Sequence, residues 1–201
     1  MSHQKSNFSA MIRVLLVVLL LSTDIVFGFL GRLIYGARTM TAEASKYPIY
    51  GEEELMSKKA HGTSEKPVQS TLRWGCDVKN ADKICNFNRH YAEFAGYWNS
   101  KTTFLEEHEG KDEEEITFYD SVTGKPLFIA PRGRSFAQFK SESIKHGWPS
   151  FRDEEVVWDN VRCLKDGEAV STTGTHLGHN LPDRSGNRYC INIISVAGNP
   201  E

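Results

Sequence analysis

Three short strings near the C-terminal end gather residue types that together can carry out thiol chemistry. The strings are Gly147-Trp148-Pro149-Ser150-Phe151, His176-Leu177-Gly178-His179 and Arg188-Tyr189-Cys190-Ile191-Asn192. They supply an indole, two imidazoles, a guanidinium, a thiol and an amide. A thiolate is a strong nucleophile, and imidazole transfers protons near neutral pH. The set therefore predicts nucleophilic cysteine chemistry on a small polar substrate.

Cys190 is the candidate nucleophile. Side chains alternate between the two faces of a strand, so Cys190 and Asn192 are expected on one face and Tyr189 and Ile191 on the other. A cysteine in a strand is, taken alone, usually an inert buried residue. Arg188, directly before it in the strand, and two nearby histidines favour the thiolate, because positive neighbours lower a thiol pKa.

The other two strings offer proton transfer and a rigid wall. His176 and His179 can face one site if the backbone turns at Gly178, which glycine allows. The alternatives are structural histidines or a metal pair, but further ligands at suitable spacing are absent from the motif. Trp148 precedes Pro149, whose fixed φ stiffens the turn, so its indole serves either as core packing or as a wall for a methyl group or a sulfur.

In this order the three strings resemble the methionine-R-sulfoxide reductase (MsrB) family, whose motifs read GWPSF, HLGH and RYCIN. The resemblance covers about residues 88–198 and includes Lys125-Pro126-Leu127-Phe128. It implies an Mss4-like fold of two antiparallel sheets. It also implies a peptide-methionine (R)-S-oxide reductase that acts on methionine-R-sulfoxide, above all in oxidised proteins or peptides, as a protein-repair enzyme of the oxidative stress response.

The resemblance also implies a role for each residue. Cys190 would attack the sulfoxide sulfur, release methionine and become a sulfenic acid. His176 and His179 would hydrogen-bond and protonate the sulfoxide oxygen, and Trp148 would enclose the S-methyl group. The residues expected to shape and polarise the pocket are Asp183, Arg188 and Asn192.

Three departures from the family pattern limit this transfer. Many members carry two Cys-x-x-Cys pairs that hold a structural zinc. Here the first pair falls on Asp120 and Thr123, and only Cys163 remains near the second, so we predict no zinc and no cofactor. The family's HLGH-Val-Phe becomes HLGH-Asn180-Leu181, which removes an aromatic contribution to the pocket.

The third departure concerns the regeneration of the nucleophile. A resolving cysteine often stands two residues before the tryptophan, and that position is His146. Cys163 is the remaining candidate inside the domain, and an external thiol, small or of the thioredoxin type, is the alternative reductant.

Residues 1–28 read as a secretory signal peptide. Basic Lys5 and Arg13 precede the apolar run 14–21, and Val26-Phe27-Gly28 ends in a small residue. The run is shorter than the roughly 20 residues that span a bilayer, so no stable membrane anchor is expected. The chain is expected in the ER lumen or outside the cell; the alternative is a plastid, because Phe29 resembles the start of an algal bipartite leader.

The rest of the chain divides into a polar linker or transit-like segment, residues 29–70, and an MsrB-like domain, residues 71–201. The domain is expected to be mainly β, with a short helical N-terminal part. Strands 116–119 and 127–129 flank one turn, strands 156–164 and 169–173 flank another, and 189–196 is a last strand. No long amphipathic helix is expected. The aromatic residues at 87, 91, 94 and 98 suit the buried face of a short helix.

Two functions other than the reductase remain open. A formal net charge of -2 gives no reason to expect a nucleic-acid partner. One rival is a non-catalytic Mss4-like β module serving as a secreted binding domain. The other is a secreted binder held by a disulfide between Cys76 and Cys85, whose pairing the spacing alone does not decide.

Overall fold

The computed structural model describes residues 46–111 and 114–201, which belong to one compact unit, Lys46–Glu201. The predicted signal peptide and the first part of the predicted linker lie outside the described residues and stay predictions. Within the described ranges, no helix is both long and apolar enough to cross a membrane.

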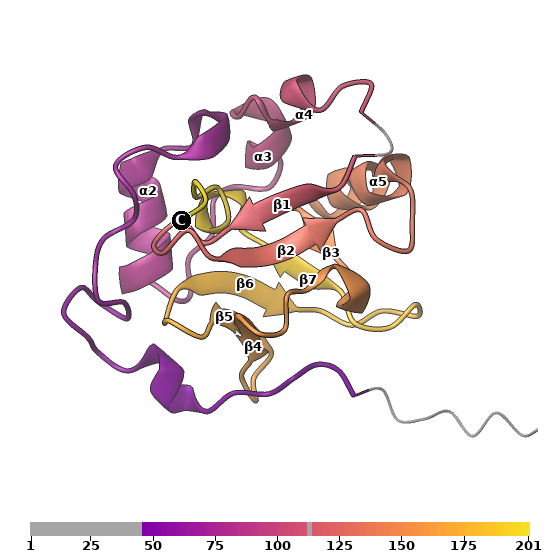
Figure 1. The fold of residues 1–201 in the computed structure, drawn as a ribbon. Helices are drawn as coiled ribbons and strands as arrows, with labels where there is room; N and C mark the ends of the chain where they lie inside the picture. The colour runs from indigo at the N-terminus through magenta and orange to yellow at the C-terminus, as the bar shows by residue number, and fades with distance from the viewer. Residues whose placement is uncertain (1–45, 112–113) are drawn as a thin grey trace, which may run out of the picture. The chain divides into compact units, whose positions relative to one another are not determined.

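Two antiparallel sheets form the centre of the unit (Figure 1). The smaller sheet is the hairpin of β1 (Ile116–Tyr119) and β2 (Pro126–Ala130). The larger one has the order β3-β7-β6-β5-β4, with β3 (Ser150–Phe151), β4 (Val161–Cys163), β5 (Glu168–Ser171), β6 (His176–Asn180) and β7 (Tyr189–Ile191). The predicted mainly β fold of two antiparallel sheets is confirmed, although the last strand is shorter than expected.

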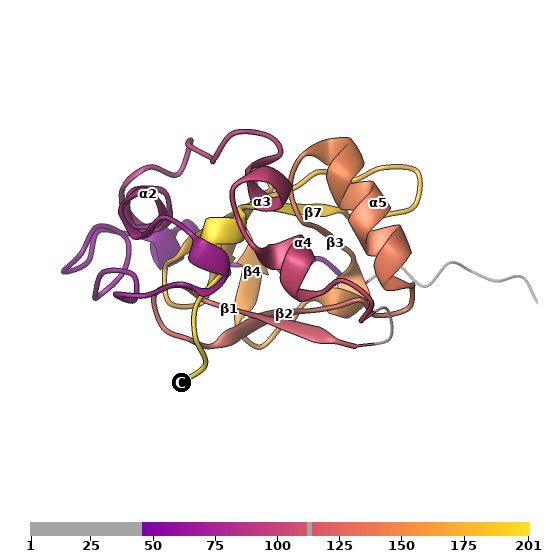
Figure 2. The same cartoon turned by 90° about the horizontal axis from the view of Figure 1, so that it is seen from above.

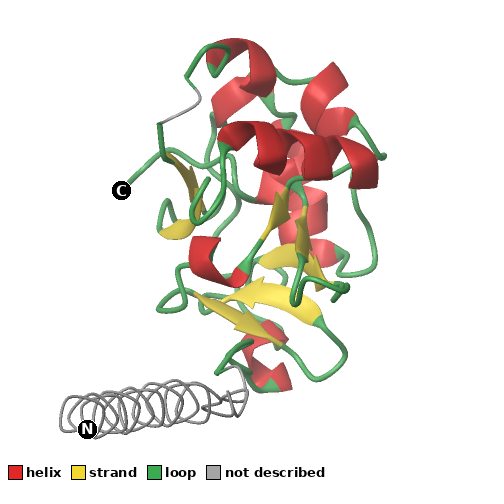
Figure 3. Ribbon diagram, turned by 90° about the vertical axis from the view of Figure 1, so that its right-hand side faces the viewer, coloured by secondary structure: helices red, strands yellow, loops and turns green. Residues whose placement is uncertain are grey.

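The helical segments are short. They are α2 (Val78–Asp82), α3 (Tyr97–Ser100), α4 (Phe104–Glu107), α5 (Phe136–His146), the 3-10 turns η1 (Glu53–Met56), η2 (Arg73–Gly75), η4 (Asp153–Glu155) and η5 (Ile193–Ser195), and the π-helical turn η3 (Lys83–Phe87). Seen from above, α2 and α5 lie at opposite ends of the unit (Figure 2). Most helical turns gather on one side of the strands (Figure 3).

Aromatic packing joins the two sheets. Phe151 of β3 stacks on Phe128 of β2 with ring centroids 4.3 Å apart, and it meets Phe118 of β1 edge to face at 4.9 Å. All three side chains are fully buried. The phenylalanine of the GWPSF string is therefore the contact that fixes β3 against the hairpin.

Helix α5 lies outside the N-terminal part of the domain, to which the sequence assigned the helical segments. A capping box begins it: the Ser135 hydroxyl accepts from the Gln138 backbone N–H, and the Gln138 side chain accepts from the Ser135 N–H. Gly147 ends it in the left-handed region at φ +88°, where a Cβ would come within 2.8 Å of the Ala95 Cβ. The helix therefore ends just before Trp148 and fixes the backbone position from which the indole extends.

The segment 88–96 corrects a second expectation. It forms no helix, and Phe87, Tyr91 and Phe94 are about half exposed, whereas Trp98 is buried. Gly96 adopts φ +85°, which interrupts helical geometry. The carbonyl of Glu93 accepts a bond from the Trp148 side chain and therefore does not take part in a helix.

Residues 46–70, predicted as linker, lie against the large sheet. The Gly51 N–H donates to the Cys163 carbonyl at 2.8 Å, and Met56 and Val68 are buried. Cys76 and Cys85 are both buried and both free thiols, so the disulfide that the spacing left open does not form.

A buried carboxylate connects the small sheet to the loop between β5 and β6. Asp120 accepts hydrogen bonds from the Val122 N–H and from the hydroxyls of Thr123, Thr173 and Thr175, at 2.9–3.2 Å. Asp120 and Thr123 are the positions where the resemblance sets the first zinc-ligand pair. Among the described residues, no group of three or more His, Cys, Asp or Glu side chains is arranged to hold a metal ion. Hydrogen bonds link these segments instead.

We expect Asp120→Ala to lower the free energy of unfolding by about 3 kcal/mol, because four donors lose their acceptor in a buried site. Urea unfolding measures this, with the exposed Asp159→Ala as matched control. EDTA is expected to leave the wild-type midpoint unchanged. Equal midpoints for Asp120→Ala and wild type would contradict the structural role of this cluster.

Candidate active site

Five of the residues singled out from the sequence line one cavity of about 390 Å³. They are Trp148, His176, His179, Cys190 and Asn192. The rest of the lining comes from Arg89, His90, Tyr91, Ala92, Gly178 and Leu181. A cavity of this size can admit a small ligand or the side chain of a substrate.

The pairing of β6 with β7 sets the central geometry. His179 lies directly opposite Cys190 across the antiparallel ladder. Side chains of such a pair emerge on the same face, with Cβ atoms roughly 5 Å apart. Tyr189 and Ile191 are fully buried on the other face, as the alternation along the strand predicts. The ladder therefore places an imidazole beside the candidate nucleophile.

Gly178 brings both histidines to this face. The register of β6 against β5 shifts here, and Leu177 turns into the core while His176 and His179 line the cavity. Gly178 has φ +154°, and a Cβ on it would lie 2.1 Å from the carbonyl oxygen of Cys190. Only glycine allows β6 to approach β7 this closely.

Backbone contacts on both sides hold Trp148 in place. Its Nε1–H donates to the carbonyl of Glu93 at 3.2 Å. The neighbouring Pro149 carbonyl accepts from the N–H of Ile191 at 3.0 Å, next to Cys190. The indole is thus tied to the loop 88–96 and to the strand of the nucleophile.

Arg188 lies beside Cys190 but behind the cavity wall. Burial raises the pKa of the Cys190 thiol, while the charge of Arg188 and its hydrogen bond to the thiol act to lower that pKa. Asp183, the remaining predicted pocket residue, does not line the cavity. It lies in a neighbouring groove, where Arg152 lowers the pKa of its carboxyl to about 2.

A buried carboxylate, not foreseen from the sequence, orients His176. Glu168 Oε1 lies 2.7 Å from His176 Nδ1, and both side chains are almost fully buried. Arg89 donates to Glu168 at 2.5–3.2 Å and also pairs with Glu53. With Nδ1 held by Glu168, Nε2 of His176 is the nitrogen available to a ligand.

His179 is suited to accept a proton. Burial, and then the proximity of His176, lower the pKa of His179. Its imidazole is therefore neutral at neutral pH and has a free lone pair. A protonated thiol and a neutral imidazole face each other at the base of the cavity.

Residues 89–92 line part of the cavity, and among them Tyr91 was expected in the core. Tyr91 lines the cavity, about half exposed, together with Leu181. An aromatic ring is therefore present although the HLGH string continues with Asn180-Leu181 instead of Val-Phe. The exposure of Tyr91 depends on tertiary contacts, which spacing does not reveal.

Cys163 is too far from Cys190 for a direct disulfide in this fold. Two strands, β5 and β6, separate β4 from β7, which corresponds to roughly 14 Å at the usual strand spacing. Cys163 aligns across the sheet with Ile191, so its side chain is on the face opposite that of Cys190. A disulfide needs Cα atoms within about 7 Å, and the geometry argues against Cys163 as the resolving thiol.

Comparison with known proteins yields one consistent set of relatives. No protein-family model matches the chain. The peptide methionine sulfoxide reductase MsrB of Methanosarcina mazei is 39% identical over 25% of this chain and 43% of the relative. The MsrB of Leifsonia xyli subsp. xyli is 40% identical over 27% and 48%, and that of Saccharophagus degradans is 37% identical over 41% and 52%.

The chain is similar to these MsrB proteins over part of its length. It spans about half the length of the curated relatives it matches. These matches support the MsrB resemblance that the motifs predict.

A second carboxylate that the sequence did not reveal lies behind the candidate site. Glu93 is 3% exposed, its Oε1 accepts from the Ile193 N–H at 2.6 Å, and its Oε2 has no partner among the described residues. Burial raises the pKa of this carboxyl to about 8. Because its pKa is raised, the Glu93 carboxyl stays largely protonated at neutral pH and places no unpaired negative charge near the Cys190 thiol.

The contribution of Glu93 to the free energy of unfolding should fall as pH rises from about 4.5 to about 8, because the folded state keeps the Glu93 proton that the unfolded state releases. Glu93→Gln carries no such proton and should gain stability relative to wild type across that window. Urea unfolding at pH 5 and pH 9 measures the difference, with exposed Glu106→Gln as control. The account is wrong if both variants show the same pH dependence as wild type.

Proposed function

We propose that this protein reduces methionine-R-sulfoxide, mainly in oxidised polypeptides, with Cys190 as the nucleophile. The observation that carries the proposal is the direct pairing of Cys190 with His179 in a cavity walled by Trp148. A thiol, a proton acceptor and an apolar wall are the parts this reaction needs. The MsrB relatives support the same reaction class.

In the first step Cys190 attacks the sulfoxide sulfur. His179 takes the thiol proton and delivers it to the sulfoxide oxygen. The attack forms an S–S bond between Cys190 and the substrate sulfur. The protonated oxygen then moves to Cys190 as the S–S bond and the S–O bond of the substrate break, which releases methionine and leaves Cys190 as a sulfenic acid. The Arg188 guanidinium stabilises the thiolate as it forms.

His176 and Trp148 orient the substrate. The Glu168 carboxylate accepts from Nδ1–H of His176, and when the ring is protonated its Nε2–H donates to the sulfoxide oxygen. The indole of Trp148 and the ring of Tyr91 receive the apolar S-methyl group. The amide of Asn192 completes the polar side of the cavity.

An external thiol restores the enzyme. The sulfenic acid at Cys190 reacts with one thiol to give a mixed disulfide and water, and a second thiol releases Cys190. The distance and facing of Cys163 favour this route over an internal disulfide. A thioredoxin-type protein or a small thiol fits as the reductant.

The experiment uses the two sulfoxide epimers of dabsyl-methionine with dithiothreitol. Wild type should reduce only the R epimer, and Cys190→Ser should lose turnover, because a hydroxyl is a far weaker nucleophile at neutral pH. Cys163→Ser is the matched control and should keep full turnover. Turnover in Cys190→Ser, or none in wild type, would reject the proposal and favour a non-catalytic binding module.

Glu168→Gln should lower kcat roughly tenfold or more, since it removes the charged acceptor that orients His176. As a positioning residue, Glu168 should affect kcat more than KM and should shift the pH profile of kcat. Glu168→Asp should restore part of the rate, and the exposed Glu154→Gln serves as control. Unchanged kcat and pH profile in Glu168→Gln would exclude this role.

A further inference from the structure

A second and larger hollow, of about 860 Å³, lies next to the cavity of Cys190. We call it the α5 groove. One side is the face of α5 that carries Ala137, Ser141 and Lys145, which are four residues apart, and the other is the loop 183–185. The small side chains of Ala137 and Ser141 leave the groove open, and no cysteine lines it.

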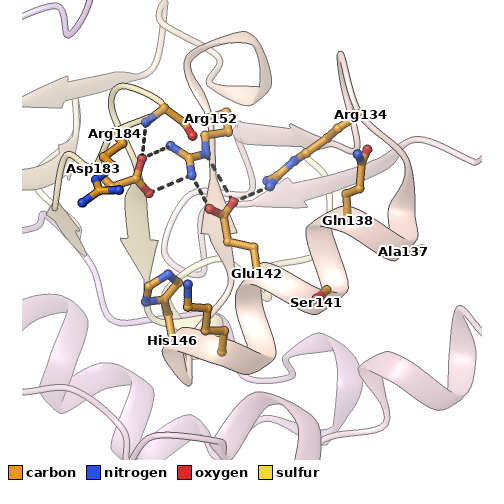
Figure 4. A pocket seen from close by; sticks show the side chains of 11 residues that line it. Arg134, Ala137, Gln138, Ser141, Glu142, His146, Arg152, Asp183 and Arg184 are labelled. Atoms are coloured by element: carbon orange, nitrogen blue, oxygen red, sulfur yellow. Dashed lines mark hydrogen bonds and ion pairs between the residues drawn. The ribbon is translucent and has the colours of Figure 1, made fainter.

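Ion pairs neutralise the carboxylates of the groove. Figure 4 shows the Arg152 side chain between the carboxylates of Asp183 and Glu142, with Arg134 on the far side of Glu142. The bond from Arg134 to Glu142 is 2.5 Å, and that from Arg152 to Asp183 is 2.9 Å. Both carboxylates therefore lie between cations and leave no free negative charge in the groove.

Positive charge remains after this pairing. Lys145 and Arg184 line the groove, are exposed, and form no ion pair with any carboxylate in the described part of the chain. The lining contains four cations and two carboxylates, a formal excess of two positive charges. His146 adds a further hydrogen-bonding ring beside Lys145.

One buried side chain lies between the groove and the active-site cavity. Arg188 lies against Cys190, and its Nε is 3.6 Å from Asp183 of the groove. His146 stands two residues before Trp148. A polypeptide with methionine sulfoxide at Cys190 would reach the groove if its chain leaves the cavity past the C-terminal end of α5.

We propose that the α5 groove binds acidic residues that flank the oxidised methionine in a polypeptide substrate. The proposal rests on the proposed function and makes it specific. Lys145 and Arg184 form ion pairs with the carboxylates of the substrate. The ion pairs of Arg152 with Glu142 and Asp183 present polar groups to the substrate backbone. Substrates rich in Asp or Glu near the methionine are preferred over neutral ones.

The test compares three substrates: a peptide with Glu residues flanking methionine-R-sulfoxide, the same peptide with Gln in their place, and dabsyl-methionine-R-sulfoxide. For wild type at low salt, kcat/KM should be about three- to tenfold higher for the Glu peptide than for the Gln peptide, which is the effect expected of two exposed ion pairs. The preference should shrink in 0.5 M NaCl, because salt screens exposed charges. The variant Lys145→Glu/Arg184→Glu should lose the preference and keep its rate on dabsyl-methionine sulfoxide.

The matched control is Lys66→Glu/Lys101→Glu, which changes the net charge equally at exposed positions outside both hollows. It should keep the preference for the Glu peptide. Equal kcat/KM for the Glu and Gln peptides, with dabsyl-methionine sulfoxide still reduced, would overturn the groove proposal alone. Failure to reduce any of the three substrates would overturn the proposed function itself.

Discussion

The close approach of β6 to β7 at Gly178 is the constraint on which the site depends. A side chain there would collide with the Cys190 carbonyl at 2.1 Å. Because glycine removes that collision, the ladder pairs His179 with Cys190, and the local shift in register turns His176 to the same cavity. The same shift in register turns Leu177 into the core. The burial of Leu177 and the placement of both histidines at the cavity therefore have the same structural cause.

Burial decides the resting charges of the site. It is the leading cause that raises the pKa of Cys190 and the leading cause that lowers the pKa of His179, so both groups are neutral at rest. Arg188 opposes the effect on Cys190 without reversing it. In the proposed reaction the thiolate therefore forms during turnover, by proton transfer to His179, and is not present in the free protein.

The parts of the structure that depend on short-range sequence patterns could be predicted from the sequence. Alternation along β7 placed Cys190 and Asn192 on the cavity side, and turn residues located both hairpins. Helix α5 was predictable too, because Ser135, Gln138 and Gly147 mark its ends, but its apolar periodicity is weak. Glu168 and Arg89 were not predictable, since their role depends on a contact between segments far apart in the chain. The even spacing of Tyr91 and Trp98 suggested a helix that Gly96 and the bond to Trp148 exclude.

The central claim is that Cys190 receives the oxygen of the sulfoxide and passes it to an external thiol. Single turnover with one equivalent of methionine-R-sulfoxide peptide, without reductant and with dimedone present, tests this by peptide mass spectrometry. The account predicts one methionine peptide formed per chain and one dimedone adduct, on Cys190. A Cys163–Cys190 disulfide, or methionine formation without modification of Cys190, would contradict it.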